Sequence, residues 1–373
     1  MQKCIAFFKK ETILCISGIL ALCSMCIIPP DAAYIDYLNT QVLVLLFCLM
    51  AVMAGLQELG IFQSVAYALL KRTGDLRQLS LVLVLLCFFF AMLVTNDVAL
   101  ITFVPFTILL LRMAKLSTQM IPLLVLQTIA ANLGSMLTPI GNPQNLYLYT
   151  ISGISPWEFI LTMLPLTLLS LFLLVVCCLQ IQDTPLAAEV VTSQRSEQMQ
   201  VKQKITLSVL LAIFAACLLT VFHVLPYTTA LIITLVWFVL FSRKVLLRVD
   251  YSLLVTFVFF FIFIGNLGRI PAMQEAISSI LEGRELFVSF LLSQVVSNVP
   301  AAVLLSGFTT EWKGLLFGVN IGGLGTLIAS MASLISYKFF VQEVPEAKGK
   351  YLKDFTKMNL IFAAVLLITA VML

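Results

Sequence analysis

Long apolar segments separated by short polar ones occupy most of the 373-residue chain. A helix needs about 20 apolar residues to cross the roughly 30 Å hydrocarbon core of a bilayer. Segments that approach this length are predicted to span a membrane, and they are 12–28, 40–56, 121–149, 157–181, 204–222, 226–242, 250–266, 312–340 and 356–373. The pattern therefore predicts an all-α polytopic membrane protein, because a helix satisfies its own backbone polar groups in lipid.

Two further apolar stretches, 76–113 and 285–310, carry polar residues near their centres. The first is interrupted by Thr95-Asn96-Asp97 and the second by Ser297-Asn298-Val299-Pro300. Backbone freed at such an interruption cannot face lipid, so it must be buried in protein or line a wet cavity. Both stretches are therefore predicted to be re-entrant hairpins. Amphipathic segments, predicted to lie at the membrane interface, precede them at 57–73 and 267–284.

A polar segment recurs in altered form inside two of the predicted spans, 121–149 and 312–340. Asn-Leu-Gly-Ser at 132–135 matches Asn-Ile-Gly-Gly at 320–323, a shift of 188 positions. The same shift pairs Asn132 with Asn320, Thr138 with Thr326, Asn142 with Ser330 and Asn145 with Ser333. Two Gly/Pro-interrupted spans at corresponding places predict a transporter with its binding site between two broken helices.

The predicted elements occur in the same order in each half of the chain: two spans, an amphipathic helix, a hairpin, a broken span and a last span. This order divides the chain into an N-terminal repeat at 1–182, a cytoplasmic linker plus connecting span at 183–225, and a C-terminal repeat at 226–373. An odd number of crossings precedes the second copy, so the repeats are predicted to be inverted. Their hairpins would then enter the membrane from opposite sides.

Charge supports the membrane assignment and orients the chain. Hydrophobic residues make up 61% of the sequence and charged residues only 11%, which excludes an ordinary soluble domain. With the N-terminus in the cytoplasm, all 22 Lys and Arg residues except Arg269, Arg284 and Lys313 fall on the cytoplasmic side. The positive-inside rule therefore predicts a cytoplasmic N-terminus and an external C-terminus. The net charge of +4 reflects this bias and indicates no nucleic-acid partner.

Asp97 is the one carboxylate well inside an apolar stretch, and an intramembrane acid indicates function. Thr95, Asn96 and Asp97 also suit the N-terminal cap of a following helix, an architectural role that is compatible with function. Burial disfavours the charged form of the acid, so Asp97 could exchange a proton in each cycle, or it could stay ionised and contribute to a cation site. The second tip, at Ser297 and Asn298, offers only hydroxyl and amide oxygens for Na⁺ or a substrate.

The two broken spans supply further ligands. Gly134, Pro139, Gly141 and Pro143 cannot all belong to one regular helix, because each proline removes a backbone donor. Unwound carbonyls and nearby amides suit a small cation, and a restarted helix offers N–H groups to an anion. Small residues that let helices pack closely are the alternative explanation for the glycines. The predicted substrate- and ion-binding residues are Thr95, Asn96, Asp97, Asn132, Thr138, Gly141, Asn142, Asn145, Ser297, Asn298, Asn320, Gly325, Thr326 and Ser330, of which Asn96, Asn142, Asn298 and Ser330 could coordinate Na⁺.

With these motifs in order, the chain resembles the ion transporter superfamily, which includes divalent anion:sodium symporters, citrate transporters and arsenite permeases. The tip Asn96-Asp97-Val98-Ala99-Leu100 followed by Pro105 is similar to the arsenite-permease-like bacterial branch. In the dicarboxylate branch the tips carry Ser-Asn-Thr, and this chain departs from that motif at Asp97 and Val299. The resemblance implies an elevator-type secondary transporter of the bacterial cytoplasmic membrane. It would move a small anion, of dicarboxylate, citrate or arsenite type, with Na⁺ or H⁺ and no other cofactor, and it could form a homodimer.

Other functions are weighed against this one. The only histidine, His223, stands at the end of a predicted span, so neither a histidine metal site nor a Ser-His pair can be assembled, and no enzyme is predicted. A cation/proton antiporter that uses Asp97 and an ion channel both remain open.

Overall fold

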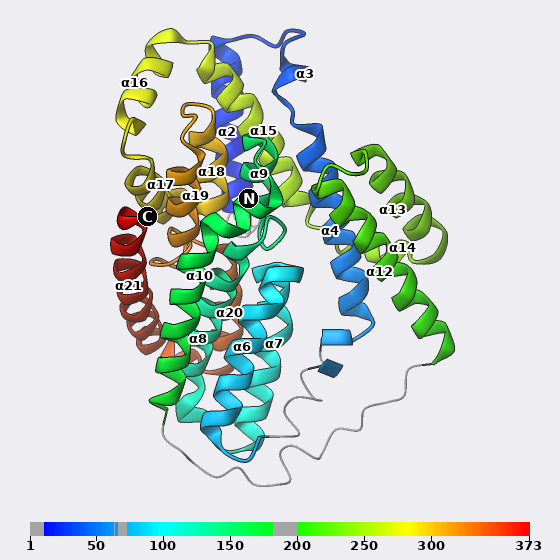
Figure 1. Cartoon of the computed structure of the whole chain (residues 1–373), viewed down its shortest axis with the longest axis vertical. Helices are drawn as coiled ribbons and strands as arrows, with labels where there is room; N and C mark the ends of the chain where they lie inside the picture. The colour runs from blue at the N-terminus through cyan, green and yellow to red at the C-terminus, as the bar shows by residue number, and fades with distance from the viewer. Residues whose placement is uncertain (1–10, 63, 66–72, 182–199) are drawn as a thin grey trace.

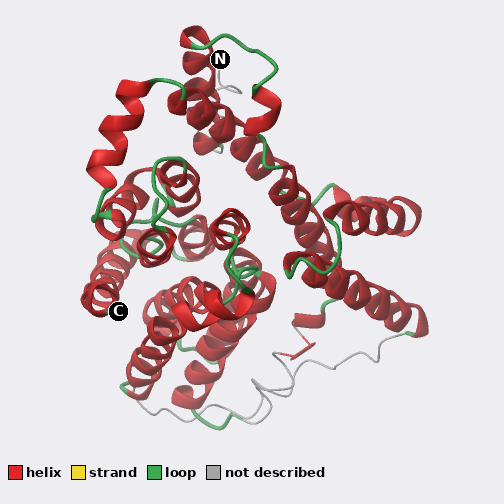
Figure 2. Cartoon of the chain, turned by 45° about the horizontal axis from the view of Figure 1, so that its top comes forward, coloured by secondary structure: helices red, strands yellow, loops and turns green. Residues whose placement is uncertain are grey.

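The computed structural model describes residues 11–62, 64–65, 73–181 and 200–373. Within these residues the chain forms helices joined by loops and no β-sheet, as Figure 2 shows. The predicted all-α class is confirmed at this level. Much of the predicted amphipathic segment 57–73 lies outside the described residues, whereas its counterpart at 267–284 contains helix α16 (Pro271–Leu281).

Helices of the first group form what we call the frame. The frame consists of α2 (Thr12–Ile27), α4 (Thr40–Glu58), α12 (Val201–Val221), α13 (Tyr227–Phe241) and α15 (Tyr251–Gly268), with the short α3 (Tyr34–Tyr37) and α14 (Arg243–Leu246). Within it, α2 packs along α15, and α4 packs with α12 and α13. Figure 1 shows α4, α12 and α13 standing together at the right of the molecule.

The remaining long helices form what we call the bundle. It consists of α6 (Leu76–Val94), α7 (Asn96–Met113), α8 (Met120–Gly134), α9 (Pro143–Ser152), α10 (Pro156–Leu179), α17 (Glu285–Val296), α18 (Asn298–Ser306), α19 (Trp312–Ile321), α20 (Met331–Glu343) and α21 (Lys348–Met372). The bundle meets the frame chiefly where α9 packs on α4 and α18 packs on α15. The two groups therefore share a narrow boundary.

In the described residues, eight helical segments are long and apolar enough to cross a membrane: 40–58, 76–94, 96–113, 117–137, 156–179, 201–221, 251–268 and 345–372. Shorter apolar helices cover 13–27, 227–241 and 285–296. The chain is thus a multi-pass membrane protein. One difference from the predicted spans is that both arms of the first hairpin, α6 and α7, are long enough to span. The predicted break within 312–340 is present, because this stretch is divided into helices of 10 and 13 residues.

Polar caps define where several helices begin. The side chains of Asn39, Asp75, Ser155 and Asp250 each accept a hydrogen bond from a backbone N–H in the first turn of α4, α6, α10 and α15. Such caps satisfy donors that a helix start leaves free, and each is typically worth about 1 kcal/mol. The helix starts are therefore set by local sequence as well as by hydrophobic length.

Candidate functional site

The first break lies between α8 and α9. Helix α8 ends at Gly134, a 3₁₀ turn follows at 135–137, and the chain is non-helical until α9 begins at Pro143. The side chain of Asn142 accepts a hydrogen bond from the Asn145 N–H at 2.8 Å and caps the restarted helix. Close approach explains two of the glycines, since a Cβ on Gly134 would lie 2.0 Å from the Phe88 carbonyl oxygen and one on Gly141 2.0 Å from that of Ser135.

The second break lies between α19 and α20 and has no proline. Its shape is held by Gln294, a residue of the hairpin arm α17. The Gln294 Nε2 donates to the carbonyls of Gly322 and Leu324, both at 2.9 Å, and its Oε1 accepts from the Thr326 N–H at 3.0 Å. Gly325 has φ of 115°, a conformation that favours glycine. One side chain from another helix therefore supports this turn.

Each hairpin tip docks on the break of its own half. The Asn96 N–H donates to the Gly141 carbonyl at 3.2 Å, and the Asn298 N–H donates to the Ala329 carbonyl at 3.0 Å. Gly141 and Ala329 are related by the same shift of 188 positions that relates the two polar segments.

A second contact also recurs at both docking sites. The hydroxyl of Thr138 donates to the Met92 carbonyl at 2.5 Å, and the hydroxyl of Thr326 donates to the Gln294 carbonyl at 3.1 Å. The repeated sequence thus corresponds to repeated contacts.

The two breaks also bond to each other through buried asparagines. Asn132 Oδ1 accepts from Ser330 Oγ at 2.9 Å, and Asn320 Oδ1 accepts from Asn142 Nδ2 at 3.3 Å. In the same way, Asn132 Nδ2 donates to Ser333 Oγ at 3.3 Å, and Asn320 Nδ2 donates to Asn145 Oδ1 at 2.7 Å. Every contact in this set has its counterpart under the shift of 188. Asn96 joins the network through its Nδ2, which donates to Asn132 Oδ1 at 3.0 Å.

The structure brings most of the predicted site residues together, but not all of them. The buried members are Asn96, Asn132, Gly141, Asn142, Asn145, Ser297, Asn298, Asn320, Gly325 and Ser330. Thr95, Asp97 and Thr138 are half-buried. Thr326 is exposed and Gly325 packs against Gln294, so both belong to the turn and lie outside the asparagine network.

Two cavities lie where the bundle faces the frame, one at each hairpin tip. The first-tip cavity, of about 210 Å³, is lined by Thr95, Asp97 and Asn142 of the bundle and by Arg248 and Asp250 of the frame. Asp97 is notable among these residues, because its Oδ1 is buried without a hydrogen-bond partner in the structure. An unpartnered buried carboxylate oxygen marks a place for a ligand or a proton.

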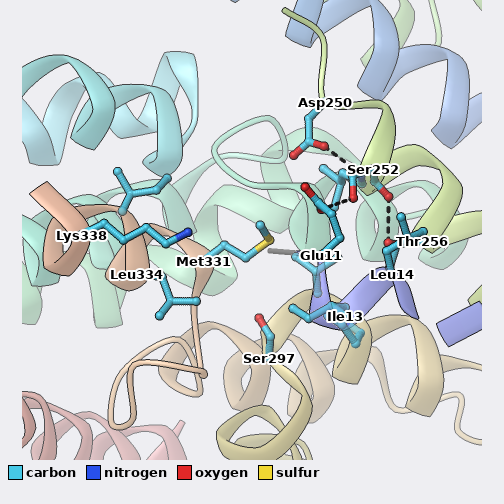
Figure 3. Close-up of a pocket in the computed structure, with 14 residues that line it drawn as sticks. Glu11, Ile13, Leu14, Asp250, Ser252, Thr256, Ser297, Met331, Leu334 and Lys338 are labelled. Atoms are coloured by element: carbon cyan, nitrogen blue, oxygen red, sulfur yellow. Dashed lines mark hydrogen bonds between the residues drawn. The ribbon is translucent and has the colours of Figure 1, made fainter. Parts of the chain in front are cut away.

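The second-tip cavity, of about 220 Å³, is lined by Ser297 of the tip, Lys338 of α20, and Glu11, Asp250 and other residues near the starts of α2 and α15. Figure 3 shows Lys338 with its nitrogen directed into this cavity and Glu11 bonded to Ser252, at 2.5 Å. Sequence reasoning missed Glu11, Asp250 and Lys338. Each stands near the end of an apolar segment, where charged residues are ordinary, so no local signal distinguishes them.

The site offers oxygen ligands for an ion rather than a transition-metal centre. Within the described residues, no three His, Cys, Asp or Glu side chains form a cluster that could hold a metal ion. Amide, hydroxyl and carbonyl oxygens together with one or two carboxylates suit hard cations such as Na⁺.

Comparison with known proteins gives the family. The citrate transporter family model matches residues 5–310. An uncharacterised transporter of Methanocaldococcus jannaschii is 33% identical over 326 residues, which cover 86% of each chain. The inner membrane protein YbiR of Escherichia coli is 33% identical over 296 residues, 78% of this chain and 77% of that one. A silicon efflux transporter of Oryza sativa is 33% identical over 139 residues, 37% of this chain and 28% of its own. With its discontinuous helices and polar centre, the chain belongs to the citrate transporter family, and it is therefore a membrane transporter and not an enzyme.

Proposed function

We propose that this protein is a secondary active transporter that moves a small anion across the cytoplasmic membrane together with Na⁺ or H⁺. The single observation that carries the proposal is the pair of hairpin tips docked on two cross-bonded helix breaks, with a cavity at each tip. Helix breaks at the centre of a membrane protein leave backbone N–H and C=O groups free to bind solutes and ions.

The paired contacts support an inverted repeat made of 1–182 and 226–373, joined by 183–225. Contacts that repeat under one constant shift are expected when two copies of one motif face each other across a pseudo-two-fold axis. Figure 1 supports the inversion, because α6 and α7 lie below the breaks whereas α17 and α18 lie above them. In this proposal the two hairpins are re-entrant and approach the binding region from opposite sides of the membrane.

Charged contacts agree with the way the predicted orientation groups residues on the two sides of the membrane. Arg112 pairs with Glu343, and Arg248 lies 3.6 Å from Glu58; all four residues are predicted to be cytoplasmic. On the predicted outer side, Arg269 pairs with Asp31 at 2.7 Å. The first-tip cavity has Arg248 and Asp250 in its wall, and both lie on the cytoplasmic side in the proposed orientation, so we propose that this conformation faces the cytoplasm. Movement of the bundle against the frame would then expose the site to the other side.

The substrate class follows from what the site contains and from the relatives. Neither hairpin tip nor helix break carries Lys or Arg, so an anion at the breaks would be held by helix N-termini, amides and a bound cation, with Arg248 and Lys338 in the walls of the two cavities as the nearest basic groups. The family name points to citrate, and the rice relative is a silicon efflux transporter. Candidate solutes for this chain are therefore citrate, dicarboxylates, arsenite and silicate.

Reconstituted flux measurements test the proposal. Purified protein in proteoliposomes would be given each candidate solute under an imposed Na⁺ or pH gradient. We expect Asp97→Asn to abolish proton-driven uptake while the protein still elutes as a folded species, because asparagine has nearly the size and shape of aspartate but cannot exchange a proton in this way. Undiminished proton-driven flux in this variant would exclude Asp97 as the coupling group.

Cation/proton antiport is the second candidate, and the unpartnered oxygen of Asp97 favours it. It predicts cation flux driven by a pH gradient in the absence of any anion. Flux that requires an anion would exclude this alternative.

A further inference from the structure

We propose that Asp250 of the frame is a second coupling carboxylate, which shares the coupling cation with Asp97 while the site faces the cytoplasm. The inference rests on the proposed function and adds a residue outside both hairpin tips and both helix breaks. It starts from the position of Asp250 between the two cavities. Four residues line both cavities, namely Asp250, Leu253, Met331 and Ile335, and Asp250 is the one charged side chain among them.

The Asp250 side chain is held in place by its own helix. Its Oδ1 accepts a hydrogen bond from the Leu253 N–H at 3.0 Å and so caps α15. A carboxylate that caps a helix with one oxygen keeps its second oxygen available as a ligand. The cap therefore fixes the acid at the cavity wall without using its full binding capacity.

Asp97 and Asp250 line the same first-tip cavity, one from the bundle and one from the frame. Asp97 Oδ1 is buried there without a hydrogen-bond partner. Two carboxylates that share a cavity repel each other when both are ionised, and a proton or a small cation bound between them removes that repulsion. The pair thus provides a cation site whose two halves come from different parts of the molecule.

The pair can act in coupling because its two carboxylates belong to different parts of the molecule. Asp97 lies in the first turn of α7 in the bundle, whereas Asp250 precedes α15 in the frame. If the bundle moves against the frame during transport, the carboxylates separate and their joint affinity for the cation is lost. A ligand shifts a conformational equilibrium only through different affinities for the two states, and this pair supplies such a difference.

Other charged groups near Asp250 come from three elements. Arg248 of the frame lies 3.6 Å from Glu58. Glu11 accepts a hydrogen bond from Ser252 on the far side of Asp250, and Lys338 of α20 points into the second-tip cavity. Arg248 is engaged by Glu58 and Glu11 by Ser252, and Asp250 is the one carboxylate besides Asp97 among the residues that line the first-tip cavity.

The variant Asp250→Asn separates charge from capping, because asparagine caps helices about as well as aspartate. Asp75→Asn is its matched control: Asp75 caps α6 in the same way, with its Oδ1 2.7 Å from the Gln78 N–H, and lines neither cavity. Asp250→Glu keeps the charge and tests for rescue.

Flux would be measured in right-side-out and inside-out membrane vesicles, with Na⁺ varied at fixed pH and then pH varied at fixed Na⁺. We expect Asp250→Asn to raise the half-saturating cation concentration on the cytoplasmic side about tenfold, within the usual range for coupling between sites. The external value should not change, Asp250→Glu should restore much of the loss, and Asp75→Asn should behave as wild type. If the half-saturating concentration shifts in the Na⁺ titration, the shared cation is Na⁺. If it shifts in the pH titration, the shared cation is H⁺.

Equal behaviour of the Asp250→Asn and Asp75→Asn variants, or equal shifts on both sides of the membrane, would overturn the inference. Failure of the proposed function is recognised separately, because wild-type vesicles would then show no gradient-driven flux at all. Wild-type coupling that is lost in Asp97→Asn and intact in Asp250→Asn would refute only the role of Asp250.

Discussion

Thr95 and Ser297 stand at the two hairpin tips with nearly the same backbone, φ of 80° and 79° and ψ of 151° and 155°. The residue after each donates its N–H to the adjacent break. Two residues after the tip, however, the first copy has Asp97 and the second has Val299. The two tips therefore share one backbone geometry, whereas only the first has a carboxylate next to it. The same tip structure thus occurs with two different chemistries.

The two breaks differ in how their turns are supported. In the first, Asn145 Nδ2 donates to the carbonyls of Ser135, Met136 and Thr138, all within the same break. In the second, Gln294 performs this task from the hairpin arm α17. The first break thus carries its own support, together with two prolines, whereas the shape of the second depends on the position of its hairpin.

The largest loss of stability should come from a substitution that prevents the close approach of Gly134 to the Phe88 backbone in the first copy. A Cβ on Gly134 would lie 2.0 Å from the Phe88 carbonyl oxygen, so Gly134→Ala must move backbone and is expected to cost more than about 3 kcal/mol. Melting in detergent, followed by size exclusion, would show loss of folded protein.

Gly323→Ala is a milder variant in the second copy, at the position that corresponds to Ser135. Its Cβ would lie 3.2 Å from Asn298 Nδ2 and 3.3 Å from the Asn320 carbonyl oxygen, contacts that a small shift can relieve, so we expect a melting temperature closer to that of wild type than for Gly134→Ala. Equal destabilisation by both variants would show that the closeness of the Cβ contact does not decide the cost.

Removal of the side chains that support the two breaks, Asn145 and Gln294, should cause an intermediate loss of stability. Asn145→Ala removes the side-chain donor to the carbonyls of Ser135, Met136 and Thr138 and one of the two acceptors of the Asn320 amide in a buried region, and it is expected to cost about 2–3 kcal/mol. Gln294→Ala should cost about 1–2 kcal/mol, because Gln294 is half-buried and water can replace part of its bonding.

Comparison of melting temperatures ranks the two variants. Hydrogen exchange would then locate the loosening, and in Gln294→Ala we expect it in both the second break and α17. Loosening confined to the break would contradict the proposed dependence on the hairpin.

The smallest change in stability is expected at the strained hairpin tips. Both tip residues occupy a φ/ψ region that is almost exclusive to glycine, which costs about 1–3 kcal/mol. Thr95→Gly is expected to stabilise by about 1 kcal/mol, net of the greater chain entropy of glycine.

Ser297→Gly should gain less, because the Ser297 hydroxyl lies 3.4 Å from the Ala329 carbonyl and that contact is lost. The measurement is again the melting temperature in detergent, paired with transport. A lower melting temperature for Thr95→Gly would show that the Thr95 side chain stabilises the tip by more than the strain costs.

Much of this architecture was predictable from local sequence. The interruptions at Thr95 and Ser297 and the unwinding near Gly141 occur where predicted, because proline, glycine and short polar side chains act on the backbone within a few residues. The assignment of Thr326 and Gly325 to the turn was not predictable, since it depends on Gln294, about 30 residues away in the chain.

The sequence by itself determined the membrane-spanning class, the positions of the breaks and the shift that relates the two copies, because hydrophobic length and helix-breaking residues are local properties. Only the tertiary structure decided that Asn132 bonds to Ser330, that Asn320 bonds to Asn142, and that Asp250 and Asp97 line one cavity. These pairings depend on which helices pack together across the bundle and the frame. A charged residue at the end of an apolar segment looks the same in the sequence whether it faces water or a binding cavity.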